Sequence, residues 1–215
     1  MLRFLIFDLD ETLYPRNAGL MQEIGVRINR YLIENLRLPQ DQASELRQRY
    51  YSQHGTALRG LVVERPDVDP EDYLQFVHNI RLADYLRPDP ALAQMLRSIP
   101  LTKVIFTNAT VEHAQKVLNL LGVATEFADI VDVRRVAYIS KPDPRAYESL
   151  LSILNARGEE CILIEDAVRN LRPGKGLGMT TILVDSVDCA EVDYCVPDIL
   201  SVKDAVQAAL QTEGT

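Results

Sequence analysis

The sequence predicts an α/β protein whose parallel β-sheet is interrupted, after its first strand, by an inserted all-helical segment. Three observations support this fold class. Residues 2–7 form a short apolar run that is typical of a buried parallel strand. Residues 17–85 place their apolar side chains at helical spacing, and from residue 88 onward helical and strand patterns alternate. The first strand and the later strands are therefore expected to share one sheet.

The inserted segment reads as several helices joined by turns. Its clearest helix is marked by apolar residues at helical spacing, which are Leu20, Ile24, Ile28, Tyr31 and Leu32. Pro39 closes that helix, and residues 45–47 and 72–74 belong to further helices. Residues 54–56 and 65–70 have the composition of turns or loops. No strand is expected within the insertion.

The rest of the chain alternates regularly. Helices are predicted at residues 90–98, 111–121, 144–155, 169–177 and 202–210, and strands at 104–106, 130–133, 161–164 and 181–184. Strands separated by helices of this length form right-handed βαβ units with a parallel sheet. Ligands of such sheets bind outside the carboxyl ends of the strands. Because the insertion follows the first strand there, we expect it to cover the binding site as a cap that excludes water.

The composition excludes several classes of protein. The 215 residues include 23 Lys plus Arg and 31 Asp plus Glu, a net charge of −8, whereas nucleic-acid polymers and anionic membranes attract basic surfaces. No apolar run approaches the roughly 18 residues of a membrane span. No secretory signal precedes the first strand, so we expect a cytoplasmic protein. Cys161 is expected to be buried, and Cys189 and Cys195 to be reduced thiols.

Polar groups follow four of the predicted strands, at the same edge of the sheet. The first strand leads into Asp8 and Asp10, and the others lead into three further pairs: Thr107-Asn108, Lys141-Pro142 and Glu165-Asp166. Each pair alone has an ordinary explanation, such as a turn, a helix cap or a solvated loop. Their convergence from four strand ends is better explained by a functional site.

The chemistry of this set fits a divalent cation and a phosphate. Asp8 and Asp166 supply the hard oxygen ligands that Mg²⁺ prefers, and Mg²⁺ commonly takes one or two carboxylates together with water and phosphate. Thr107 offers a hydroxyl group, and Lys141 a compact positive charge. Without the metal and the lysine, the acids would repel a phosphate dianion.

The motif Asp8-Leu9-Asp10-Glu11-Thr12-Leu13-Tyr14-Pro15, followed in order by the three other pairs, resembles the haloacid dehalogenase (HAD) superfamily of aspartate-nucleophile phosphohydrolases. This resemblance implies a Rossmann-like core formed by residues 1–15 and 87–215. It also implies a helical cap domain formed by residues 16–86.

Residue by residue, the resemblance implies that Asp8 is the nucleophile that becomes an aspartyl-phosphate and that Asp10 is the general acid and base. Asp8, the backbone carbonyl of Asp10, and Asp166 would bind Mg²⁺. The phosphate would contact three residues: Thr107, Asn108 and Lys141. Glu165 and Asn170 would act on the metal through water or from behind its ligands, although many relatives have an acid where Asn170 stands.

A finer resemblance links the chain to the pyrimidine 5′-nucleotidase-like branch. It rests on the segments DETLYP, HGTALRGL, DYLQFVH, LRPDPALAQMLRSIP and FTNATVEHAQKVL. In the cap, the candidates for substrate contact are His54, Gly55, Thr56 and Arg59, whose alternative role is a helix-linking turn with an exposed arginine. His78 and His113 are expected to be surface histidines on helical faces.

The function expected from these residues is the Mg²⁺-dependent hydrolysis of small phosphomonoesters, with nucleoside 5′-monophosphates as leading substrates. A sugar-phosphate phosphatase and a phosphomutase remain alternatives, and so does a non-catalytic protein that binds a phosphorylated metabolite. Dehalogenase relatives generally lack an acid at the position of Asp10, which favours phosphoester chemistry. We expect a monomer or homodimer that binds a small phosphorylated metabolite, and neither a nucleic-acid polymer nor a membrane.

Overall fold

The core of the protein is a six-stranded parallel sheet with the strand order β3-β2-β1-β4-β5-β6. A computed structural model describes residues 1–212. The strands are β1 (Phe4–Phe7), β2 (Thr102–Phe106), β3 (Asp129–Val131), β4 (Cys161–Glu165), β5 (Thr180–Val184) and β6 (Tyr194–Val196). The predicted parallel α/β sheet is confirmed. The edge strand β6 was not predicted, because three residues of mixed polarity give no periodic signal.

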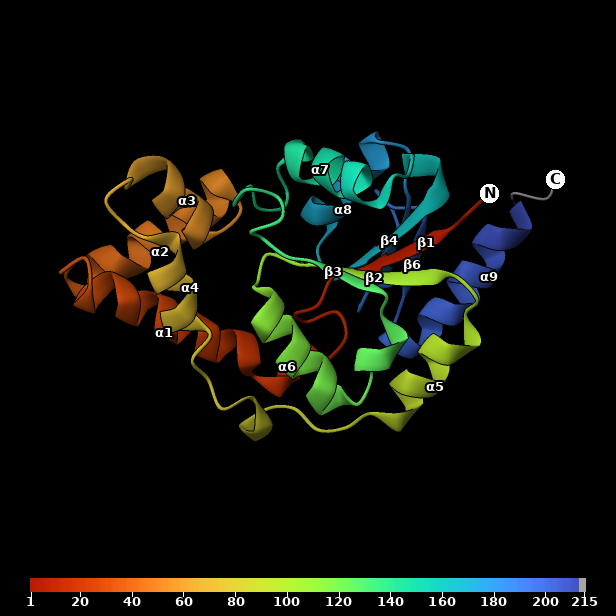
Figure 1. The fold of residues 1–215 in the computed structure, drawn as a ribbon, viewed down its shortest axis with the longest axis horizontal. Helices are drawn as coiled ribbons and strands as arrows, with labels where there is room; N and C mark the ends of the chain where they lie inside the picture. The colour runs from red at the N-terminus through yellow and green to blue at the C-terminus, as the bar shows by residue number, and fades with distance from the viewer. Residues whose placement is uncertain (213–215) are drawn as a thin grey trace.

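Helices cover both faces of the sheet (Figure 1). They are α5 (Pro90–Ser98), α6 (Val111–Leu121), α7 (Pro144–Leu154), α8 (Val168–Gly176) and α9 (Val202–Thr212). The alternation of side chains along β1 explains the two layers: Leu5 and Phe7 belong to the apolar cluster formed with α5, α6 and α9. Ile6 points the other way and joins the cluster formed with α7 and α8. Both clusters fix the position of the strand that ends at Asp8.

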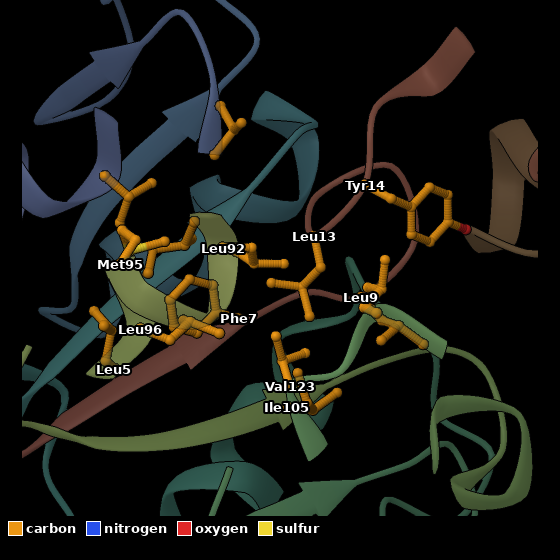
Figure 2. Close-up of a cluster of buried hydrophobic side chains, with 14 of the residues drawn as sticks. Leu5, Phe7, Leu9, Leu13, Tyr14, Leu92, Met95, Leu96, Ile105 and Val123 are labelled. Carbon is orange, nitrogen blue, oxygen red and sulfur yellow. The ribbon is translucent and has the colours of Figure 1, made fainter. Parts of the chain in front are cut away.

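The chain just after β1 is anchored by the first of these clusters. Figure 2 shows Leu9 and Leu13 packed among the buried side chains that surround Phe7 and Ile105. Tyr14 is part of the same cluster through its ring, while its hydroxyl group points away from the other side chains (Figure 2). The acidic residues between these apolar anchors are therefore held by packing on both sides.

The segment between β1 and α5 is helical, as predicted. Its helices are α1 (Leu20–Glu34), α2 (Gln40–His54), α3 (Ala57–Glu64) and α4 (Pro70–Val77). They lie together beside the sheet (Figure 1) and have an apolar cluster of their own, which includes Tyr31, Leu32 and Tyr73. We call residues 16–86 the cap segment.

One prediction about the cysteines is confirmed and the other is wrong. Cys161 is buried and free, as predicted. Cys189 and Cys195 form a disulfide, so the prediction of reduced thiols is wrong. The two cysteines are six residues apart, and nothing in the sequence indicated that β6 lies against the loop that precedes it. Among residues 1–212, no helix has the length and hydropathy needed to cross a bilayer.

Candidate active site

A cavity of about 550 Å³ lies between the carboxyl ends of the strands and the cap segment. On the core side it is lined by Asp8, Asp10, Glu11, Thr107, Asn108, Ala109, Lys141, Asp166, Ala167, Arg169 and Asn170. From the cap segment come apolar side chains, among them Ile24, Ile28, Leu74 and Val77, together with a few polar ones. The structure thus brings side chains that follow β1, β2 and β4 into one cavity, together with Lys141 from the connection between β3 and α7.

The centre of the site is an ion-paired cluster around Lys141. Its ammonium nitrogen lies 2.7 Å from Oδ1 of Asp8 and 2.6 Å from Oε1 of Glu165, and it donates to the carbonyl oxygen of Phe106 at 2.8 Å. The side chains of Lys141 and Glu165 are at most 1% exposed. Thr12 donates its hydroxyl to Oδ2 of Asp8 at 3.1 Å. All three donors of one lysine are therefore used inside the protein.

Burial raises the pKa of Asp8 above its usual value, and Lys141 opposes that shift. Burial also raises the pKa of Glu165, with a contribution from the charge of Asp8. Burial disfavours the ammonium form of Lys141, but these two carboxylates outweigh it and raise the lysine pKa. The lysine is consequently a fixed positive charge beside Asp8, and it favours the ionised form that a nucleophile needs.

The side chain of Glu165 is held in this cluster by several hydrogen bonds. Besides Lys141, its carboxylate accepts a hydrogen bond from Nδ2 of Asn170 at 2.9 Å and one from the backbone N–H of Ala167 at 3.4 Å. The backbone of Asn170 is also fixed, since its main-chain carbonyl oxygen accepts a hydrogen bond from the Tyr147 hydroxyl. Both residues therefore lie where they orient the lysine and the loop after β4.

Asp10 sits beside the cluster with two donors on one oxygen. The hydroxyl of Tyr14 donates to Oδ1 at 2.6 Å, and Nε2 of His113 lies 3.3 Å from the same oxygen. Burial favours the neutral acid, but the hydrogen bond and charge of His113, together with the hydrogen bond from Tyr14, outweigh it and lower the pKa of Asp10.

The prediction of a surface histidine is wrong for His113, which is buried, and His78 is only partly exposed. The side chain of His113 is 1% exposed, and it lies against Asp10 on the inner face of α6. His78 caps the carboxyl end of α4, lines the cavity and stacks on His113, with 4.4 Å between ring centroids. The helical periodicity around each residue is compatible with either face, so the sequence did not reveal their burial.

Thr107 and Asn108 follow β2 and line the cavity opposite Asp8. The Asn108 side chain clamps the backbone of Lys141: its Oδ1 accepts from the amide N–H at 2.8 Å, and its Nδ2 donates to the carbonyl at 3.2 Å. The hydroxyl oxygen of Thr107 accepts from the backbone N–H of Ala109 at 3.0 Å, so its proton can be donated to a ligand.

A divalent cation fits the acidic edge of this site. The ligand oxygens of Asp8, Glu165 and Asp166 lie within 4.8 Å of one another. Glu165 is fully buried and does not line the cavity, whereas Asp8 and Asp166 do, so the oxygens of Asp8 and Asp166 form the donor set that suits Mg²⁺. Arg16 reaches in from the cap segment and donates to Oδ2 of Asp166 at 2.6 Å. A cation at Asp166 and this arginine would compete for the same carboxylate.

The four residues expected to contact substrate from the cap segment do not lie together. Gly55 and Thr56 line the cavity, and Thr56 also donates its hydroxyl to Oγ of Ser140 at 2.9 Å. His54 and Arg59 are not among the lining residues. The Nε2 atom of His54 lies 3.1 Å from Oε1 of Glu64, within the cap segment. His54 ends α2 and Arg59 lies within α3, whereas Gly55 and Thr56 form the turn between these helices, and only this turn lines the cavity.

Sequence reasoning missed several polar residues that line the cavity, among them Arg47, Tyr51 and Arg169. Arg169 stacks on the Tyr51 ring and donates to the carbonyls of Tyr51 and Gly55, so it joins α8 to the cap segment. Arg47 lies one turn before Tyr51 on α2, and its Nε is buried with no hydrogen-bond partner within the described residues. The i, i+4 spacing of Arg47 and Tyr51 was the available signal.

A protein-family model for haloacid dehalogenase-like hydrolases matches residues 2–178. Among curated proteins, the chain is 26% identical over 200 residues to Phosphate metabolism protein 8 of Saccharomyces cerevisiae, covering 84% of this chain and 61% of that protein. The chain therefore spans less than two thirds of that relative. It is 24% identical to a Glyceraldehyde 3-phosphate phosphatase of Methanocaldococcus jannaschii, covering 96% of this chain and 98% of the relative.

Solved structures share the fold at lower identity. A HAD phosphatase from Thermococcus onnurineus superposes with a TM-score of 0.64 and 17% identity, covering 95% of this chain and 98% of that one. An L-2-haloacid dehalogenase from Xanthobacter autotrophicus gives 0.62 and 16%, covering 96% and 99%. Because these neighbours carry different chemistries on one architecture, the likeness establishes the fold alone.

Proposed function

The chain belongs to the haloacid dehalogenase-like hydrolase family, and from that premise we propose that it is a Mg²⁺-dependent phosphatase of small phosphomonoesters. The observation that carries this proposal is the pairing of Asp8 with Lys141 next to a second carboxylate, Asp10, in one cavity. A lone carboxylate would serve a dehalogenase as nucleophile. The second acid supplies the proton that an alkoxide leaving group requires.

In the proposed reaction, a carboxylate oxygen of Asp8 forms a bond to phosphorus as the bond from phosphorus to the ester oxygen breaks. The negative charge of the bound phosphate favours the protonated form of Asp10, which takes up a proton from the medium as substrate binds and gives it to the departing oxygen. Asp10 then takes a proton from water, which attacks the phosphorus of the aspartyl-phosphate and restores Asp8 as inorganic phosphate leaves. Lys141 and the hydroxyl of Thr107 stabilise the negative charge on the phosphoryl oxygens.

For the metal, we propose the carboxylates of Asp8 and Asp166 and the backbone carbonyl of Asp10 as ligands. When bound, Mg²⁺ neutralises charge on the phosphoryl group and offsets the repulsion by the acids. Glu165 and Asn170 support this arrangement from behind, through Lys141 and the loop after β4. Residues 16–86 form the cap that closes the cavity, and Gly55 and Thr56 are its substrate-facing turn.

The leading substrates are nucleoside 5′-monophosphates. The cap side of the cavity is apolar along Ile24, Ile28 and Leu74, which suits a flat base, and Arg47 lines the same side, where its guanidinium group would contact the polar edge of a base. The cavity volume of about 550 Å³ lies within the range of small-ligand sites. The likeness to a glyceraldehyde 3-phosphate phosphatase over nearly the full length of both chains favours a sugar phosphate as the second candidate.

A panel of nucleoside monophosphates and sugar phosphates, assayed for phosphate release with and without Mg²⁺, tests the proposal. We expect release to require Mg²⁺ and to fall by about a thousandfold in Asp8→Asn. Asp166→Asn should raise the Mg²⁺ concentration needed for half-maximal activity. Phosphate exchange between two sugar phosphates without release would indicate a mutase instead. Ligand-induced thermal stabilisation without turnover of any compound would indicate a binding protein.

A further inference from the structure

The buried His113 and the partly buried His78 meet where the cap segment returns to the core. His78 follows the last residue of α4, and its backbone N–H donates a hydrogen bond to the carbonyl of Leu74. His113 lies in the first turn of α6, on the face that packs inward. Their rings are 4.4 Å apart at an angle of 31°. One ring thus comes from each of the two parts that enclose the cavity.

His113 also touches the acid that the proposed reaction uses. Its Nε2 lies 3.3 Å from Oδ1 of Asp10, and the Tyr14 hydroxyl donates to the same oxygen from 2.6 Å. Tyr14 is anchored in the apolar cluster beneath β1, so its direction is set by the core. Two donors on Oδ1 fix the plane of the Asp10 carboxyl group and leave Oδ2 for proton exchange.

Packing alone does not explain the histidine pair. The Nδ1 atoms of both His78 and His113 are buried without a hydrogen-bond partner in the described part of the chain. A buried polar atom without a partner costs free energy, and two phenylalanine rings would fill this space without that cost. The donor that His113 offers to Asp10 therefore accounts for an imidazole at that position.

We propose that His113 is a positioning residue for Asp10, and that His78 couples the position of the cap segment to it through the stacked rings. The inference rests on the proposed function of Asp10 as general acid and base. While the cap covers the cavity, His78 holds the His113 ring and Asp10 points at the reacting oxygen. Moving the cap away removes this support, so Asp10 is held in position for proton transfer only while the cap covers the substrate.

The test compares two phosphomonoesters that differ in their need for an acid. p-Nitrophenyl phosphate releases a stable phenolate, whereas uridine 5′-monophosphate releases an alkoxide that must be protonated. In His113→Phe, which keeps the ring but loses the donor, we expect kcat for the nucleotide to fall about 10- to 100-fold with little change in KM. The fall for p-nitrophenyl phosphate should be several-fold smaller. His113→Gln keeps an amide donor and should recover most of the loss.

The contribution of the cap is tested by His78→Ala against His78→Phe. The alanine variant removes the stacked ring, so its kcat for uridine 5′-monophosphate should be lower than that of the phenylalanine variant. The effect should again be larger for this nucleotide than for p-nitrophenyl phosphate, because the nucleotide has the poorer leaving group. Lys116→Ala, at an exposed position of α6, is the matched control and should behave as the unmodified protein. Thermal unfolding of each variant shows whether it is folded.

The inference is overturned if His113→Phe lowers both substrates equally, as a merely structural residue would, or if it leaves both unchanged. Equal kcat values in His78→Ala and His78→Phe would overturn the coupling to the cap. These failures are distinguishable from failure of the proposed function. If Asp10→Asn keeps full nucleotide turnover, the acid role itself is wrong, whereas loss in Asp10→Asn with no effect of His113→Phe removes only the present inference.

Discussion

The ammonium nitrogen of Lys141 lies 2.7 Å from Oδ1 of Asp8, at a place where the lysine side chain is 1% exposed and the aspartate side chain 10%. A charge pair so far from water is stabilising only while both partners are present. The same contact orders the proposed nucleophile and supplies the positive charge that a phosphoryl group needs. Stability and catalysis are therefore expected to fail together when the pair is broken.

Lys141→Met should lower the free energy of unfolding by about 3 kcal/mol or more at pH 8, because it leaves two buried carboxylates unpaired. Without the lysine, the folded-state pKa values of Asp8 and Glu165 rise further above their unfolded values. The folded protein then binds more protons than the unfolded chain, so its stability falls as pH rises. The loss in the free energy of unfolding should be smaller at pH 5 than at pH 8, measured in urea titrations with chelator present. Lys116→Met controls for the loss of an exposed lysine, and an equal cost at both pH values would contradict this account.

Gly55→Ala should disturb the site through its backbone. Gly55 has a φ of 87°, and a Cβ atom there would lie 2.5 Å from the carbonyl oxygen of Lys141 and 2.6 Å from Cδ of Pro142. We expect a loss of about 1–3 kcal/mol in stability and a lower kcat, because Lys141 must shift. Gly122→Ala is the matched control, since its φ is 75° but a Cβ meets nothing within 4 Å. Equal effects of the two variants on kcat would refute the close approach as the cause.

An ion pair between the cap segment and the core makes the free energy of unfolding depend on pH. Arg134 binds Glu71 through two hydrogen bonds of 2.8 and 2.7 Å, and the Tyr138 hydroxyl donates to the same carboxylate. The hydrogen bond from Arg134 is the largest cause that lowers the pKa of Glu71, to about 2. This contribution to stability is present above the unfolded pKa near 4.5 and is lost as pH falls toward 2.

Glu71→Gln should therefore lower stability at neutral pH by about 1 kcal/mol or less, since the carboxylate is 44% exposed. It should also make the decline in stability between pH 4.5 and 2 shallower. Thermal unfolding across this range measures both effects. Glu45→Gln, at an exposed position of α2, removes a carboxylate elsewhere. A decline as steep in Glu71→Gln as in the unmodified protein would rule out this ion pair as its source.

Arg47→Met should alter substrate choice. Its side chain lines the cavity, so its guanidinium group is placed to contact a carbonyl of a bound base. The variant keeps the apolar stem of the side chain, and we expect KM for uridine 5′-monophosphate to rise about tenfold relative to that for phenyl phosphate. Arg49→Met is a matched control, because Arg49 binds Glu64 instead. An unchanged ratio of KM values would show that Arg47 does not read the substrate.

The sequence predicted the fold through its strongest periodic signals. The apolar run that contains β1 and the helix–strand alternation after residue 88 give the parallel sheet, because burial on both faces leaves continuous apolar strands. β6 escaped prediction because three residues at a sheet edge need no apolar run. The Cys189–Cys195 disulfide escaped because neither its spacing nor its context resembles a disulfide framework.

The site was predictable where a residue follows a strand, and less so elsewhere. Asp8, Thr107 and Asp166 were found because carboxyl ends of parallel strands converge at one edge. His113 lies within a helix, where only the three-dimensional packing decides which face meets Asp10. Arg169 and Arg47 depend on how the cap segment lies over the sheet, which no local pattern encodes.

The central claim is that Asp8 carries the phosphoryl group during turnover. Mixing the protein with uridine 5′-monophosphate and Mg²⁺, quenching in acid within milliseconds and sequencing the peptides by mass spectrometry tests it directly. The account predicts a phosphoryl group on Asp8, convertible to homoserine by borohydride, and none in Asp8→Asn. Phosphate release that continues in Asp8→Asn, or a phosphoryl group found on another residue, would contradict the account.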